Sequence, residues 1–459
     1  MRAEIVRNRV IVGVVLSGLA LTACSSSPAK SGGSDPANGS NSAATASAQQ
    51  SSASAPATPA VSPAPSATTA AVASPAATSP SATSSVTAAA ASPVALAGVL
   101  PAGEGDARDR VPWAQVGPGW FLVLDDSSAP PAEDGVTPRP QAGVHTLSLV
   151  SPTASRYVIA SWPGEAAGSG LLSQAGLAAW SGDGHRALFL AAGPGLVEVD
   201  LTTGAWHAIP IENLNSVNVG YTTPAGTNVY AMQTVFAQDG TEAGENLVRL
   251  NRDGVVQVQL AHFDSGSPEW LAAADGDAVF LSGFGGLRKV SNAGGVVTSL
   301  PTFAKPDVNC VPVSWWTPQT IVAKCNIGAG DQLWLVPTAG GQARPLTPAP
   351  GAGPVGAGYR SALRIGATTY AQHLEGCGVV SIHTLAPNGV GTRVHIPASL
   401  SNDVMIGAAG TKIAVVSATE CGWPSWFGFY DPATKTTQKI IPDVPGELGV
   451  DNALAFPGR

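Results

Sequence analysis

Residues 195–211, GLVEVDLTTGAWHAIPI, hold two short apolar runs on either side of a polar turn at Thr202-Thr203-Gly204. Short runs rich in β-branched residues around such a turn predict an antiparallel β-hairpin. The same pattern occurs seven times between residues 145 and 441. The turns centre near residues 152, 203, 253, 293, 339, 388 and 432. A unit that recurs with a mean period of about 47 residues predicts a repeat architecture.

Another apolar run precedes most of these hairpins, for example RALFLAAG at 186–193, DAVFLSGFG at 277–285 and KIAVVSATE at 412–420. Each period therefore holds about four strands, which is typical of a β-propeller. We expect an all-β propeller of four-stranded blades, with seven blades favoured and six or eight as alternatives. The alternatives stay open because the first blade is irregular between Asp125 and Gly143. A string of three or four β-sandwich domains is the competing fold, but it would not give one regular period.

Ring closure needs one blade that is completed from both ends of the chain. The last nine residues, DNALAFPGR at 451–459, form one extra strand beyond the seventh hairpin. We expect this strand to pair with the first strands of the domain, within VPWAQVGPGWFLVLDD at 111–126.

One repeat has a closer likeness to a known family. The segment LAAWSGDGHRALFLA at 177–191 resembles the WD40-like repeat of TolB-type propellers, whose inner hairpin reads Trp-Ser-Pro-Asp-Gly, and AAADGDAVFLS at 272–282 is a weaker copy. Gly182 replaces the proline. The resemblance implies a propeller and says little about the ligand. The matching residues are Trp180, Ser181, Asp183, Gly184, Ala187 and Phe189.

The N-terminus has the features of an export signal. Three arginines precede an apolar stretch, Val10 to Leu21, which is about half the length that a membrane-spanning helix needs. Leu21-Thr22-Ala23-Cys24 follows and resembles the lipobox of bacterial lipoproteins. The resemblance implies export, acylation of the Cys24 thiol and cleavage before it, which would hold the protein on the extracytoplasmic face of the cell membrane. The alternative is an ordinary signal peptide with a chance cysteine.

A long segment of low complexity follows Cys24. From Ser25 to Gly98 the chain contains no aromatic residue, and its only charges are Lys30 and Asp35. A segment rich in serine, alanine, proline and threonine cannot bury enough apolar surface to offset its ordering entropy. We therefore expect a signal peptide at 1–23, a disordered tether at 24–98 and the propeller at 99–459.

Four cysteines remain in the propeller region: Cys310, Cys325, Cys377 and Cys421. An even number in an exported chain predicts two disulfides, with three pairings open. Cys310 and Cys325 are equidistant from the turn at Thr317-Pro318, so we expect them to face each other across one hairpin. Cys377 and Cys421 lie on equivalent loops of successive blades, and a bridge there would join the two blades. Four free thiols are the alternative.

No stretch of the sequence indicates catalytic, cofactor or metal chemistry. The seven histidines form neither His-x-His nor His-Glu-x-x-His, so each reads as an ordinary strand or turn residue. The net charge is −8 and charged residues make up 12% of the chain, which disfavours nucleic acid and fits a protein or neutral glycan partner. We expect Trp423 and Trp426 to be exposed, although they could merely cover a disulfide. With Glu375 and Glu420, they are the candidate ligand-binding residues.

The sequence therefore predicts a lipid-anchored envelope protein whose propeller is a non-catalytic binding or scaffold module. The alternative is an exported propeller enzyme, either a glycan-acting hydrolase or lyase or a quinoprotein-like dehydrogenase. The two differ at the axis of the ring. An enzyme should gather two carboxylates, or a histidine with a carboxylate, in the axial funnel.

Overall fold

The computed structural model describes residues 97–100, 107–128, 143–163, 176–191, 195–264, 268–301, 307–327, 330–349, 358–375, 378–419, 425–445 and 447–457. The expected signal peptide and almost all of the expected tether, with Cys24, lie outside these residues. The regular secondary structure of the described residues is almost entirely β-strand, with one short α-helix, α1 (Ala107–Arg110), and one 3-10 turn, η1 (Trp113–Gln115). In this part of the chain, no helix reaches the length and hydropathy that crossing a membrane requires.

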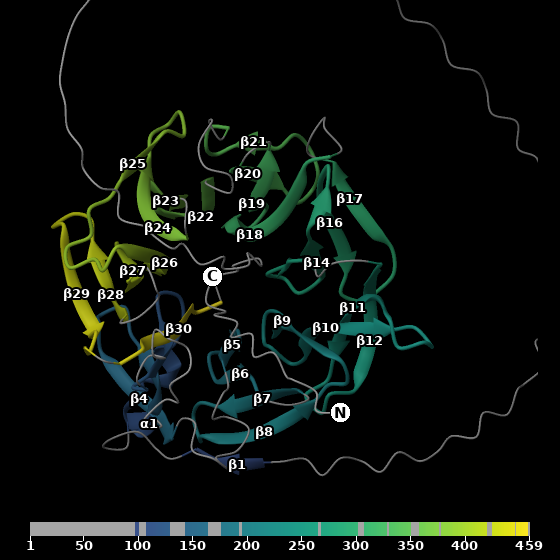
Figure 1. The fold of residues 1–459 in the computed structure, drawn as a ribbon, viewed down its shortest axis with the longest axis horizontal. Coiled ribbons are helices and arrows are strands. Elements are labelled where there is room, and N and C mark those ends of the chain that lie inside the picture. Colours follow the sequence, from purple (N-terminus) through teal and green to yellow (C-terminus); the bar gives the residue numbers. More distant parts are fainter. Residues whose placement is uncertain are drawn as a thin grey trace, which may run out of the picture. The chain divides into compact units, whose positions relative to one another are not determined.

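The strands pair with their neighbours along the chain into antiparallel groups, which surround a central axis as the blades of a β-propeller (Figure 1). The first groups along the chain are β2 (Phe121–Asp126), β3 (Val144–Val150) and β4 (Arg156–Pro163); β5 (Gly176–Trp180), β6 (Arg186–Leu190), β7 (Gly195–Asp200) and β8 (Ala205–Pro210); β9 (Leu214–Tyr221), β10 (Val229–Phe236), β11 (Glu242–Leu250) and β12 (Val256–Phe263). A separate short strand, β1 (Ala97–Val99), adds to the outer edge of β8.

The following groups are joined into one continuous sheet. Single parallel bridges, Gly286 with Asn309 and Asp331 with Gly358, link them. Their strands are β13 (Trp270–Ala272), β14 (Ala278–Leu281), β15 (Gly283–Phe284), β16 (Gly286–Ser291) and β17 (Val297–Pro301); β18 (Asn309–Thr317), β19 (Thr320–Ile327), β20 (Gly330–Pro337) and β21 (Arg344–Pro345); β22 (Gly358–Ile365), β23 (Thr368–Glu375), β24 (Val379–Leu385) and β25 (Gly391–Arg393).

The last strand of the described region joins the sheet of β2, near the start of the described region. The last group is β26 (Asn402–Ala409), β27 (Lys412–Ala418), β28 (Ser425–Asp431) and β29 (Thr436–Ile441), and the chain then forms β30 (Gly449–Ala455). β30 pairs antiparallel with β2 in the order β30-β2-β3-β4. The expected pairing of the C-terminal strand with residues 111–126 is confirmed. The hairpins expected from the repeat are also present, because each pair of runs forms adjacent strands.

The core lies between neighbouring sheets. On β2, Phe121 and Val123 pack toward β27 and β28, whereas Leu122 and Leu124 pack toward the sheet of β5–β8. All four side chains are fully buried. Successive side chains of a strand point to opposite faces, so a strand between two sheets needs apolar residues at every position. The continuous run FLVL therefore marks a strand that is covered on both faces.

The Trp-Ser-Gly-Asp-Gly turn shows why its residues suit a tight hairpin. The Asp183 carboxylate accepts hydrogen bonds from Ser181 Oγ (2.5 Å) and from the backbone N–H of His185 (3.0 Å). Gly184 has φ of +78°, a conformation that costs glycine nothing. Trp180 donates its indole N–H to the Gly184 carbonyl at 3.1 Å. The turn is thus held together by bonds among the residues of the motif itself.

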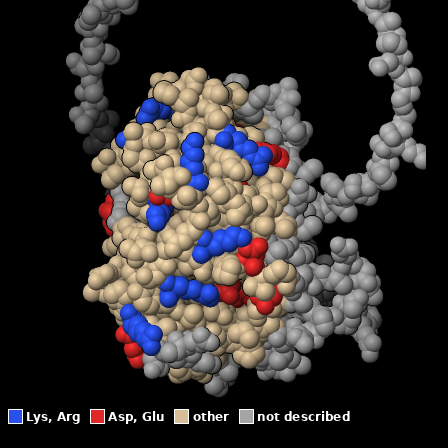
Figure 2. All heavy atoms as spheres, turned by 90° about the vertical axis from the view of Figure 1, so that its left-hand side faces the viewer, with Lys and Arg blue, Asp and Glu red and all other residues tan. Residues whose placement is uncertain are grey.

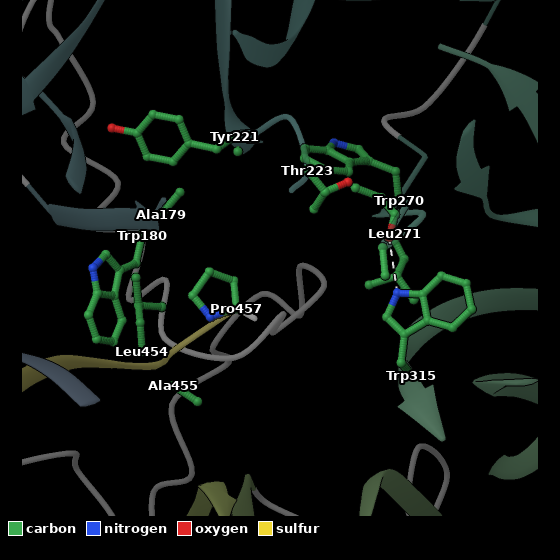
Figure 3. Close-up of a pocket in the computed structure, with 13 residues that line it drawn as sticks. Ala179, Trp180, Tyr221, Thr223, Trp270, Leu271, Trp315, Leu454, Ala455 and Pro457 are labelled. Carbon is green, nitrogen blue, oxygen red and sulfur yellow. Dashed lines mark hydrogen bonds between the residues drawn. The ribbon is translucent and has the colours of Figure 1, made fainter. Parts of the chain in front are cut away.

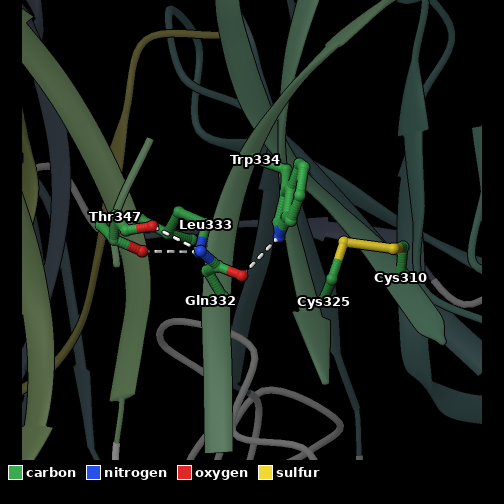
Figure 4. Close-up of a disulfide and its surroundings, with 6 residues drawn as sticks. All are labelled: Cys310, Cys325, Gln332, Leu333, Trp334 and Thr347. Carbon is green, nitrogen blue, oxygen red and sulfur yellow. Dashed lines mark hydrogen bonds between the residues drawn. A yellow bond between two sulfur atoms is a disulfide. The ribbon is translucent and has the colours of Figure 1, made fainter. Parts of the chain in front are cut away.

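A disulfide joins Cys310 on β18 to Cys325 on β19 (Figure 4). The two residues are direct partners in the antiparallel register, as the position of the turn predicts. Both are fully buried in the core between β13–β17 and β18–β21. The second expected bridge, Cys377 to Cys421, lies outside the described residues.

Arg108 on α1 ties three segments together near the closure of the ring. Its guanidinium donates hydrogen bonds to the carbonyls of Ile159 on β4 (2.6 Å), Thr203 after β7 (2.7 Å) and Leu100 (2.7 Å). Only 8% of the residue is exposed, and burial lowers the pKa of the guanidinium. A charged side chain is rarely buried unless its donors are satisfied. Arg108 therefore connects two neighbouring sheets and the entry strand.

Candidate functional site: an apolar pocket at the axis

A cavity of about 270 Å³ lies beside the innermost strands of four successive groups, β5, β9, β13 and β18, and beside the C-terminal strand β30 (Figure 3). None of the residues around it is acidic, basic or histidine. The lining residues are Ala179, Trp180, Gly220, Tyr221, Thr223, Trp270, Leu271, Ala272, Ala274, Trp315, Leu454, Ala455 and Pro457.

Three tryptophans form most of the wall, and their rings are held in place. The Trp180 indole N–H is bonded to Gly184, as described above, and Trp315 donates to the carbonyl of Ala272 at 3.0 Å. The Trp270 ring packs edge-on against Tyr230, with ring centroids 5.2 Å apart. Figure 3 shows the three rings around the cavity, from β5, β13 and β18. Fixed rings give a preformed apolar surface.

The two hydroxyl groups at the wall already have partners, whereas the buried indole N–H of Trp270 has none among the described residues. The Tyr221 hydroxyl donates to the Glu198 carboxylate at 3.0 Å, and burial raises the pKa of Tyr221 well above its ordinary value. The Thr223 hydroxyl donates to the carbonyl of Ala273. The pocket can therefore hold an apolar or aromatic group by burial and ring contacts. Its volume is near the lower end of ligand sites, which run from roughly 300 to 1,000 Å³, and suits one side chain or ring better than a long chain.

The expected ligand-binding residues do not form one exposed site. Trp426 is fully buried between β23 and β26–β28 and donates its indole N–H to the carbonyl of Ala398 at 3.1 Å. The expectation that Trp426 is exposed is wrong, because its position on β28 faces the neighbouring sheet. Trp423 and Glu420 lie outside the described residues.

Glu375 lies at the end of β23 among polar neighbours. Its carboxylate accepts a hydrogen bond from Ser381 Oγ at 2.5 Å and lies 3.3 Å from the guanidinium of Arg393. His383 Nε2 is 3.8 Å from the same carboxylate. The hydrogen bond from Ser381 is the main cause that lowers the pKa of Glu375. Burial lowers the pKa of both His373 and His383, and each histidine is only partly exposed.

The aromatic wall of the pocket was not predicted as a site from the sequence. Trp180, Trp270 and Trp315 are separated by 90 and 45 residues, close to two and one periods of the repeat. This recurrence is a signal that could have placed them on equivalent inner strands. The group around Glu375 leaves no comparable linear motif, because strand pairing across β23 and β24 brings it together.

Comparisons with known proteins give structural likenesses only. No protein family matches the chain, and no curated protein matches its sequence. TolB from Acinetobacter baumannii is 12% identical with a TM-score of 0.39, over 72% of this chain and 66% of that one. A puromycin-hydrolyzing peptidase of Mycobacterium tuberculosis gives 12% identity and a TM-score of 0.47, over 79% and 57%. The Pyrococcus horikoshii acylaminoacyl peptidase gives 11% and 0.45, over 71% and 51%. This chain therefore spans only about half to two thirds of the length of those structures.

Proposed function

We propose that the protein is a lipoprotein of the bacterial envelope, anchored through acylated Cys24, whose seven-bladed propeller is a non-catalytic binding module. The tether at 24–98 would hold the propeller away from the membrane. Seven groups of strands, the first of them joined by β30, support a count of seven blades. The observation that carries the binding role is the wall of the axial pocket, in which aromatic rings face a cavity and no lining residue is acidic, basic or histidine.

We expect the occupant to be an apolar or aromatic side chain of a protein partner. Binding in such a pocket gains free energy from apolar area, at about 25 cal/mol per Å², and from ring contacts worth about 0.5–1.5 kcal/mol each. On the face shown in Figure 2, Lys, Arg, Asp and Glu side chains are scattered over a mainly uncharged surface.

The pocket can be blocked without touching the tryptophans. Ala274 lines the cavity and lies in the turn between β13 and β14, so Ala274→Trp places a ring in it. Ala293→Trp is the matched control, because Ala293 is exposed at the outer turn between β16 and β17. We expect short peptides with an exposed aromatic residue to change the tryptophan emission of the wild type. Ala274→Trp should weaken this binding at least tenfold, and Ala293→Trp should leave it unchanged.

The same samples distinguish a binding module from an enzyme. Mass spectrometry of each peptide after incubation should show the peptide intact. Equal binding by both tryptophan variants would contradict the role of the pocket. Turnover of peptide or glycan that survives in Ala274→Trp would favour the exported enzyme instead.

A further inference from the structure

The polar group at the end of β23 and β24 has the composition of a metal site. His373 and Glu375 are two apart on β23, and Ser381 and His383 are two apart on β24, so each pair points to one face of the sheet. The register sets His373 opposite Ser381 and Ala371 opposite His383. One donor atom each from His373, Glu375 and His383 lies within 4.8 Å of the others.

Both histidines have ring nitrogens that lack partners. The Nδ1 atoms of His373 and His383 are buried and have no hydrogen-bond partner among the described residues. The two rings stack with centroids 4.9 Å apart, and Tyr359 packs edge-on against both, 4.8 Å from His373 and 5.9 Å from His383. A buried polar atom without a partner is costly. The unpartnered atoms are the Nδ1 atoms, whereas the atom of His383 that faces Glu375 is Nε2, so the packing holds the His383 ring with Nε2 turned toward the carboxylate.

We propose that His373, Glu375 and His383 bind a zinc-type divalent cation. Two imidazole nitrogens and one carboxylate oxygen are a donor set that zinc takes in three-ligand protein sites, with the fourth position left to water or another ligand. The site is distinct from the axial pocket, and its validity does not depend on the proposed function. The site lies on the face of β22–β24 that packs against β18–β20. Tyr359 and Ala371 are among the residues of this face that make the contact.

The distances need only a small adjustment. Zinc–nitrogen bonds of about 2.0–2.1 Å in a tetrahedral site put donor atoms about 3.3 Å apart. His383 Nε2 and Glu375 Oε1 are already 3.8 Å apart, and 4.8 Å is the widest separation in the set. Small shifts of these partly buried side chains would close such gaps. Glu375, with 35% of its side chain exposed, also gives the cation a route from solvent.

Two neighbours act on the site without belonging to the donor set. Ser381 Oγ bonds the Glu375 carboxylate at 2.5 Å and lies 3.0 Å from His383 Nε2, so it orients both. The guanidinium of Arg393 faces the same carboxylate, and 52% of its side chain is exposed. Arg393 contacts Oε2 of Glu375, whereas His383 faces Oε1, so the positive charge of Arg393 would lie beside a bound cation and oppose its binding. Removing that charge should therefore strengthen binding.

The test uses the full chain purified without a histidine tag and stripped with a chelator. Calorimetric titration with ZnCl₂ should give one site per chain. His383→Gln and Glu375→Gln should each weaken binding at least tenfold, whereas Arg393→Gln should strengthen it severalfold. His262→Gln is the matched control, because His262 is exposed beside Asp264 on another blade and should leave the affinity unchanged.

Folding of each variant is checked by its metal-free melting curve, and X-ray absorption of the zinc-loaded wild type gives a readout that needs no variant. Two imidazole ligands in that spectrum support the proposal. A zinc shell without imidazole, no binding at all, or equal affinity in wild type and His383→Gln would each overturn it.

Discussion

Replacing Arg108 with methionine should loosen the seam where the ring closes. The substitution keeps an unbranched apolar stem but removes the donors for the carbonyls of Ile159, Thr203 and Leu100, which lie 2.6–2.7 Å away. A buried carbonyl that loses its partner costs about 1–3 kcal/mol. Part of this cost is offset, because the variant no longer buries a charge. We therefore expect a net loss of about 3 kcal/mol.

Differential scanning calorimetry converts this loss into a temperature shift. An unfolding entropy of about 2.1 cal/mol/K per residue gives roughly 0.8 kcal/mol/K for a domain of this size, so the melting temperature should fall by about 4 °C. Arg110→Met is the matched control, because Arg110 is exposed on the same helical turn. Arg108→Lys should also lose stability, since an ammonium on a single stem cannot reach three carbonyls. A melting temperature for Arg108→Met equal to that of Arg110→Met would refute the role given to Arg108.

Three other results are expected. Cys24→Ala should release the protein from the membrane fraction, because it removes the site of acylation; a variant that is processed to the same mass and still sediments with membranes would contradict the anchor. Replacing both Cys310 and Cys325 by alanine should lower the free energy of unfolding by about 3 kcal/mol, the value of the loop-entropy model for a 15-residue separation. Reductant should then hardly change the calorimetric melting curve of this variant. Burial raises the pKa of Asp125 to about 6, against about 3.9 in an unfolded chain. Between about pH 4 and 6, the folded state therefore keeps the proton on Asp125, whereas the unfolded state has lost it. The free energy of unfolding should fall as the pH rises through this range, by at most about 3 kcal/mol in total. Asp125→Asn should flatten this dependence in melting curves at pH 4.5 and 7.5; an unchanged slope would argue against the buried carboxyl as its source.

Local sequence patterns predicted most of the fold. Strands and turns are set by neighbouring residues, so the repeated hairpins, the closing strand and the facing pair Cys310 and Cys325 could be predicted from spacing alone. The continuous run at Phe121–Leu124 could be interpreted as a strand covered on both faces only once its neighbours were known.

The candidate sites were harder to predict because they depend on which strands lie side by side. Trp426 has the sequence surroundings of a loop residue, but its register on β28 turns it into the core. His373 and His383 are ten residues apart, and only the pairing of β23 with β24 makes them neighbours. Arg108 could not be linked to Ile159 and Thr203 from the sequence, because those partners are 51 and 95 residues away.

The placement of β1 also determines how the domain would respond to mechanical force. Any pull exerted through the residues before Ala97 reaches β1 first, and β1 lies on the outer edge of β8 rather than in the sheet that β30 closes. The three residue pairs of β1 with β8, backed by the bond from Arg108 to Leu100, would then bear the load. The pairing of β30 with β2 would remain unstressed until β1 detached, so a domain pulled from this end should lose its first short strand and keep its ring.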